Sequence, residues 1–153
     1  GEGQFNIVHN IDTDRDGRVY IADRENRRVQ VFSSEGAFLA QWGNLSRTAA
    51  VYVDTRGDRD LVYAGEYFGG IGSNDTGTDL GPRVTVFDTS GKILARVSRQ
   101  PYGDEPGRFY APHGMAVDSH GDVYVGEVSW TEFGKNFDPP REVRSVQKLV
   151  LQR

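Results

Sequence analysis

Short apolar alternations separated by turn residues run along the chain. Val29 and Val31 flank Gln30, and Gly17 and Gly36 lie in the nearest turn segments. Alternation with a period of two is typical of β-strands that bury one face, and glycine supplies the positive φ that tight turns need. The pattern predicts an all-β fold, with Val29 and Val31 on a buried face and Gln30 on a face toward water.

The same pattern occurs three times. Residues 3–23 match residues 107–127 without a gap, and residues 28–32 match residues 83–87. A further copy, which starts near residue 44, lies between the first two. A period of about 40 residues, expanded by insertions, is that of the four-stranded blade of a β-propeller.

We therefore expect a single partial propeller over residues 1–153, with no helix. The blades are expected at about residues 3–43, 44–102 and 103–153. The strands are expected at 7–14, 18–23, 27–33 and 37–42, then at 49–54, 61–66, 82–88 and 92–97, and finally at 113–118, 122–127 and 143–150. The last blade lacks its outer strand. Three blades are half of a six-bladed ring.

Half a ring leaves one strand edge and two blade faces without neighbours, and such surfaces favour association. Two kinds of partner are expected. A second copy of the chain closes the ring as a homodimer, or a longer parent chain supplies the missing blades. The beginning of the chain at a repeat boundary favours a missing upstream part.

The composition is that of a globular domain with many turns. The chain is 37% hydrophobic and 26% charged, and its 19 glycines make up about 12% of it, against an average near 7%. The net charge of −4 argues against nucleic acid as the main partner, because an acidic surface repels phosphates. The absence of cysteine excludes disulfides and thiolate metal sites. No apolar run is long enough for a membrane helix.

The first repeat resembles an NHL repeat, through Gly3-Gln4-Phe5, His9, Asp14, Gly17 and the run Tyr20–Phe32. More narrowly, the chain is similar to the propeller of peptidyl-α-hydroxyglycine α-amidating lyase and its bacterial relatives. The stretches that carry this similarity are Ala111–Gly114, Val123–Trp130 and Arg144–Leu149. The resemblance implies a six-bladed propeller, of which this chain is the C-terminal half, and an exported or secretory protein.

The resemblance also implies a zinc ion on the ring axis, held by histidines from three alternate blades. His9 and His113 match two of these positions, and the third ligand belongs to the missing half. The residues themselves allow this reading, since imidazole is the commonest metal ligand in proteins. They equally allow histidines that bond only to backbone groups at the ends of inner strands. Calcium is not expected, because Gly114 replaces the family's calcium-binding aspartate.

Arg24 matches an arginine that, in the family, lies near the substrate carboxylate. A guanidinium can bind a carboxylate through two hydrogen bonds, although local ion pairs within the charged run 23–28 are an equally ordinary role. Tyr67 and Trp130 open two long insertions at one edge of the ring, followed by Phe68 and Phe133. These aromatic residues either wall a ligand site at the mouth of the channel or only shield strand ends.

Two classes of function follow. The chain belongs either to a zinc-dependent enzyme of the lyase type that acts on a small carboxylate or peptide end, or to a propeller module that binds proteins or peptides without chemistry. No catalytic residue is assigned, because no nucleophile–base arrangement occurs in the repeats. RNA binding, known for some NHL propellers, is disfavoured by the acidic charge.

Overall fold

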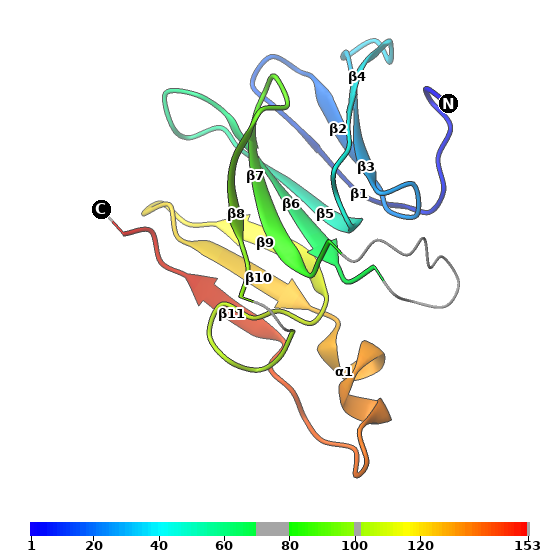
Figure 1. The fold of residues 1–153 in the computed structure, drawn as a ribbon. Helices are drawn as coiled ribbons and strands as arrows, with labels where there is room; N and C mark the ends of the chain where they lie inside the picture. Colours follow the sequence, from blue (N-terminus) through cyan, green and yellow to red (C-terminus); the bar gives the residue numbers. More distant parts are fainter. Residues whose placement is uncertain (70–79, 100–101, 153) are drawn as a thin grey trace.

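A computed structural model describes residues 1–69, 80–99 and 102–152, which form three antiparallel sheets (Figure 1). The first sheet contains β1 (Val8–Thr13), β2 (Val19–Asp23), β3 (Arg28–Phe32) and β4 (Phe38–Trp42) in that order. The second contains β5 (Arg47–Asp54), β6 (Leu61–Tyr67), β7 (Arg83–Asp88) and β8 (Ile93–Val97). The third contains β9 (Pro112–Val117), β10 (Val123–Glu127) and β11 (Val146–Leu149).

These sheets are propeller blades, and the prediction of three blades whose last one lacks its outer strand is confirmed. Each sheet is a meander, in which every strand pairs with the next one in the sequence. The inner strands β1, β5 and β9 lie next to one another, and the second sheet lies between the other two. The strands overlap the ranges predicted from the alternation of apolar residues.

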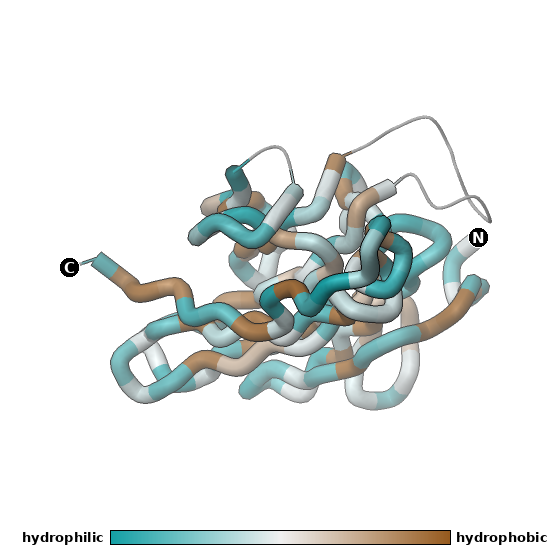
Figure 2. Tube along the Cα trace, turned by 90° about the horizontal axis from the view of Figure 1, so that it is seen from below, coloured by the Kyte–Doolittle hydropathy of each residue, from teal (hydrophilic) through white to brown (hydrophobic). Residues whose placement is uncertain are grey.

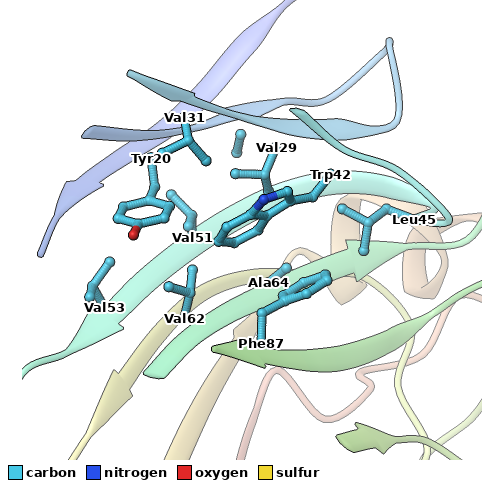
Figure 3. Close-up of a cluster of buried hydrophobic side chains, with 11 residues drawn as sticks. Tyr20, Val29, Val31, Trp42, Leu45, Val51, Val53, Val62, Ala64 and Phe87 are labelled. Carbon is cyan, nitrogen blue, oxygen red and sulfur yellow. The ribbon is translucent and has the colours of Figure 1, made fainter. Parts of the chain in front are cut away.

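The core fills the two spaces between neighbouring sheets. Between the first and second sheets, side chains from both sheets surround Trp42, whose ring lies 5.1 Å from that of Phe87 and 5.4 Å from that of Tyr20 (Figure 3). Between the second and third sheets, the buried residues include Tyr63, Phe109 and Val125. Burial of these alternating apolar positions is what holds the blades face to face.

The expectation of no helix is wrong. A four-residue helix, α1 (Ser129–Glu132), and a 3-10 turn, η1 (Gly134–Asn136), occupy the insertion between β10 and β11. A hydrogen bond to a residue outside the helix stabilises it, since the Ser129 hydroxyl donates to the carbonyl oxygen of Arg144 at 2.8 Å. The alternation of apolar residues could not predict this helix, because contacts with residues elsewhere in the chain hold the segment in place. None of the helices in the described part of the chain has the length and hydropathy needed to cross a bilayer.

The prediction that Gln30 faces water is also wrong. Its side chain is fully buried, and its amide group donates to Asp23 at 3.1 Å and to the carbonyl oxygen of Gln4 at 3.0 Å. The N-terminal segment covers this face of the first sheet, since the amide of Gly3 donates to Gln30 in turn. A polar residue in an alternating strand can therefore mark a buried polar network instead of a solvated face.

Candidate functional site

The two predicted histidine ligands lie together where the inner strands of the first and third sheets begin. The Nε2 atoms of His9 and His113 are 2.9 Å apart, and their rings meet edge to face at 4.7 Å between centroids. Residues separated by most of the chain thus converge on one point. Alternate blades bring equivalent positions together in this way because the inner strands lie side by side.

A β-bulge positions each histidine. The pairing register between β1 and β2 skips His9, and the register between β9 and β10 skips His113. The register between β5 and β6 skips Ala49, the equivalent residue of the middle sheet. A bulged residue leaves the normal pleat, so its side chain can be directed away from the sheet face. The small Ala49 side chain is buried between the two histidine-bearing strands.

An acid at the end of each second strand, fully buried in the first two sheets and half-buried in the third, anchors the segment that enters the bulge. Asp23 accepts the backbone N–H of Asn6 at 2.8 Å, and Glu66 accepts that of Ser46 at 2.5 Å. Glu127 accepts that of Tyr110, also at 2.5 Å. Each donor lies three positions before the bulged residue. The repeats in the sequence showed that the acids occupy matching positions. They did not show that each acid binds the backbone before the inner strand and so fixes the direction in which that strand enters the sheet.

Arg24 lies directly beside the histidine pair. Its Nη1 atom is 3.1 Å from Nε2 of His9, and its Nε donates to Glu25 at 2.7 Å. Because a guanidinium has no acceptor, Nε2 of His9 must be unprotonated in this arrangement. The 2.9 Å contact then requires His113 to donate its Nε2 proton to His9. The contacts therefore place no proton on Nε2 of His9 and one proton on Nε2 of His113.

Electrostatics favour the same protonation state. Burial, followed by the charge of Arg24 and by His113, lowers the pKa of His9 to about 4. Burial and Arg24 also lower the pKa of His113 below its ordinary value. At neutral pH both imidazoles are therefore neutral, and each has one unprotonated ring nitrogen that can bind a metal ion or accept a hydrogen bond from a ligand.

Glu25, Arg47 and Tyr67 form the buried side of the cluster. Arg47 makes an ion pair with Glu25, and its guanidinium lies 5.7 Å from the centre of the Tyr67 ring. Burial raises the pKa of Tyr67 to about 12, so its phenol stays protonated at neutral pH. With neutral histidines, Arg24 and Arg47 oppose the single carboxylate of Glu25. The immediate surroundings of the histidines therefore carry a net positive charge.

One donor of this cluster is unsatisfied. The Nη1 atom of Arg47 is buried and makes no hydrogen bond within the described part of the chain. A buried donor without a partner is costly and commonly marks a place where a ligand or water completes the network. Sequence reasoning missed both Glu25 and Arg47. Glu25 was hidden in a charged run, and Arg47 reaches the site only through the packing of the second sheet on the first.

The histidine pair fits two of the ligands of a zinc ion. Two nitrogens bound to one tetrahedral zinc at about 2.0–2.1 Å lie about 3.3 Å apart, so the observed 2.9 Å needs only a small opening. In residues 1–69, 80–99 and 102–152, no group of three histidine, aspartate or glutamate side chains could hold a metal. A zinc site with three protein ligands would take its third ligand from outside these residues.

The predicted aromatic residues lie in three different surroundings. Tyr67 belongs to the cluster, with its ring 6.0 Å from that of His113. Phe68 and Phe133 pack on each other at 4.9 Å, next to Tyr110. Trp130, on α1, is 42% exposed and makes no ring contact or hydrogen bond with either histidine in the described structure. The insertion after Tyr67 continues into residues 70–79, including Gly70, Gly72 and Gly77, which lie outside the described residues.

Comparison with known proteins agrees with the repeat pattern and the blades. The family model described as NHL repeat matches residues 5–32. The chain is 47% identical over 45 residues to human NHL repeat-containing protein 3, a match that covers 29% of this chain and 13% of the human protein. It is 30% identical over 155 residues to peptidyl-glycine alpha-amidating monooxygenase A of Xenopus laevis, covering 98% of this chain and 15% of the frog protein.

The fold likeness extends to solved structures. Virginiamycin B lyase from Staphylococcus aureus superposes with a TM-score of 0.58 at 14% identity, over 99% of this chain and 43% of that protein. The chain therefore consists of propeller blades, and the first of them matches the NHL repeat. Over nearly its whole length, it is similar to the amidating monooxygenases. It spans less than a sixth of the length of these curated relatives and less than half of the solved propeller.

Proposed function

We propose that the cluster around His9 and His113 is the ligand site of a zinc-dependent, lyase-type propeller that acts on a small carboxylate or on a peptide end. The convergence of the two Nε2 atoms beside Arg24 supports this proposal more than any other observation. The similarity to an amidating monooxygenase over 98% of the chain suggests the substrate class.

The charges around the pair suit a carboxylate. Arg24 is only partly covered and could turn one edge of its guanidinium from His9 toward a ligand. Arg47 adds a second positive charge and the unsatisfied Nη1 donor. Tyr67 adds a phenol that can donate a hydrogen bond at neutral pH. These groups would orient the ligand, and Glu25 would hold both guanidiniums in place.

A zinc ion bound by His9 and His113 would supply a Lewis acid that polarises an oxygen of the ligand. Binding it would require His113 to carry its proton on Nδ1, because both Nε2 atoms would face the metal. Arg24 would have to move off His9 at the same time. A carboxylate that accepts hydrogen bonds from Arg24 would favour that movement, so ligand and metal are expected to bind cooperatively.

Zinc titration of histidine variants tests this proposal. His9→Gln and His113→Gln are each expected to lower zinc affinity by about tenfold or more, because each variant removes a direct ligand. His120→Gln is the matched control, since this third histidine lies exposed in the turn between β9 and β10. Equal zinc affinity in all three variants would remove the metal site from the proposal.

The alternative is a propeller module that binds peptides without chemistry. One observation favours it: His9, Arg24, Glu25 and Arg47 already satisfy most of one another's polar groups without a metal. Incubation with N-benzoyl-α-hydroxyglycine separates the two functions. An enzyme of the amidating type releases benzamide and glyoxylate from this compound. A binding module binds it without turnover, and Arg24→Ala is expected to lower the affinity.

We also propose that further propeller blades complete the molecule, as a second copy or as part of a longer chain. Figure 2 shows hydrophobic stretches near both ends of the chain. The exposed apolar residues of the first and third sheets match positions that are buried between neighbouring sheets.

A further inference from the structure

The outer edge of the third sheet lacks the strand that closes the other two. In the first two sheets, β4 pairs with β3 and β8 pairs with β7. The third sheet has the order β11-β10-β9, and within the described residues no strand pairs with the outer side of β11. An unpaired edge presents backbone donors and acceptors to any extended segment that approaches it.

The register shows which backbone groups point outward. The N–H of Glu127 donates to the carbonyl oxygen of Ser145 at 2.8 Å, and Val125 pairs with Gln147 two positions further along. Bonded and non-bonded pairs alternate in an antiparallel ladder. The N–H and C=O groups of Val146 and Lys148 therefore point away from β10, toward the unpaired side.

A groove runs along this side. It has a volume of about 910 Å³ and lies between the end of β8 and β11. Every residue from Val146 to Val150 lines it, although successive side chains of a strand point to opposite faces. Because side chains from both faces of β11 line the groove, the groove follows the backbone edge of this strand. Val146 and Val150 are 64% and 67% exposed, so the groove also has an apolar lining.

The charged lining of the groove has one sign. Its basic side chains are Arg96, Arg99, Arg144 and Lys148, and none of the described residues that line it is an aspartate or a glutamate. Arg144 is engaged with the carbonyl oxygens of Glu105 and Arg108, and Lys148 with Asp122 at 2.8 Å. Arg96 and Arg99 are exposed and make no ion pair in the described structure.

We infer that this groove binds an extended peptide strand, which pairs with β11 and carries acidic side chains between apolar ones. The edge supplies main-chain hydrogen bonds, as in other cases of β-strand addition. The valines take the apolar side chains, and Arg96 and Arg99 take the acidic ones. The chain's own outer strand β8 is a poor occupant, because the hairpin that contains it carries Lys92 and Arg96.

A peptide that copies residues 92–98 with Lys92→Glu and Arg96→Glu tests the inference. Fluorescence anisotropy at low and high salt measures its binding to the whole chain. The unsubstituted peptide of residues 92–98 is the comparison, since it has the same apolar pattern and the opposite charge. The acidic peptide is expected to bind at least about tenfold more tightly, with an affinity that falls as salt rises. Equal binding of the two peptides would overturn the choice of an acidic partner.

A pair of variants tests the strand pairing. Lys148→Pro removes the outward N–H and leaves the bonded pairs with β10 intact, a position at which an edge strand tolerates proline. Lys148→Ala removes the same ammonium group and keeps the N–H. The acidic peptide is expected to bind the alanine variant and to lose at least about tenfold in affinity for the proline variant. Equal binding to both variants would exclude pairing with this edge.

Hydrogen exchange tests the strand pairing without any substitution in the chain. In the unsubstituted chain, the acidic peptide is expected to slow exchange of the amides of Val146 and Lys148. The amide of Gln147 already donates toward β10 and should change little. Protection confined to other parts of the chain would place the peptide elsewhere and overturn the inference.

Discussion

At the scale of single residues, Gly91 joins a turn of the second sheet to the core between the first two sheets. Its φ is +88°, and a Cβ added there would lie 2.4 Å from Nε1 of Trp42. Gly36 occupies the equivalent turn of the first sheet with a φ of +85°, and a Cβ added there would have no atom within 4 Å in the described structure. The two glycines therefore share a backbone requirement and differ in packing.

Substitution by alanine separates these two effects. Gly36→Ala is expected to destabilise the chain by about 1–2 kcal/mol, through the left-handed backbone alone. Gly91→Ala is expected to cost about 1–3 kcal/mol more, because Trp42 must move. Urea denaturation followed by tryptophan fluorescence measures both. Equal losses of stability would mean that the indole ring adjusts without strain.

The match of residues 28–32 with residues 83–87 continues to Gly36 and Gly91, but the sequence could not predict the contact of Gly91 with Trp42. Turn chemistry is local, whereas this contact joins two blades. The same distinction explains the site. His9, His113 and Arg24 were found because repeats align equivalent positions, whereas Arg47 and the burial of Gln30 depend on which segment covers which face.

At the scale of elements, the acid at the end of each second strand is the feature that every blade repeats to anchor its inner strand. Arg28 pairs with Asp23 at 2.8 Å, and Arg83 pairs with Glu66 at 2.9 Å. The third sheet has Ser145 at the corresponding place, next to β11. The pKa values reflect this difference. Burial opposes ionisation of Asp23, but its hydrogen bonds, including that from Arg28, lower the pKa, whereas burial raises the pKa of Glu127.

Neutral substitutions at these two acids are expected to have opposite pH trends. Asp23→Asn removes the charged acceptor of Arg28, which still donates to Gln41 and Gln4, and should destabilise the chain by about 1–3 kcal/mol at neutral pH. This loss should shrink as the pH falls through the lowered pKa, because the wild-type carboxyl group is then also neutral. Glu127→Gln should cost more near pH 4.5 than at pH 7, since ionisation of the buried wild-type group lowers its stability as the pH rises.

Thermal denaturation of both variants and the wild type between pH 3 and pH 7 measures these trends. The alignment of the repeats predicted that Asp23 and Glu127 are equivalent acids, but not that they differ in pKa. That difference comes from the balance of burial and hydrogen bonds: the bonds from Asn6, Asn26 and Arg28 outweigh burial at Asp23, whereas burial outweighs the hydrogen bonds at Glu127. Parallel pH trends in the two variants would contradict the role given to Arg28.

At the scale of the whole molecule, the outward faces of the first and third sheets have the design of faces that are buried inside. Phe5 is 39% exposed, whereas its counterparts Leu45 and Phe109 are 2% and 0% exposed. On the other side, Val146 is 64% exposed, whereas its counterparts Val29 and Val84 are 0% and 1% exposed. Each of the two observed joints pairs a face of the Val146 type with a face of the Phe5 type. The two exposed faces are therefore complementary to each other.

A chain that carries both halves of the same joint can join to a copy of itself. Light scattering is therefore expected to give a mass of about 34 kDa, twice the 17.0 kDa of the chain. Phe5→Glu and Val146→Glu should each return the mass to that of one chain, because a charge would be buried in the joint. Leu94→Glu is the control. This residue is 37% exposed on the middle sheet, outside both joints, and its substitution should leave the larger mass unchanged. A mass of one chain for the unsubstituted protein would instead assign these faces to further blades of a longer chain, because the exposed apolar positions would still require a neighbour.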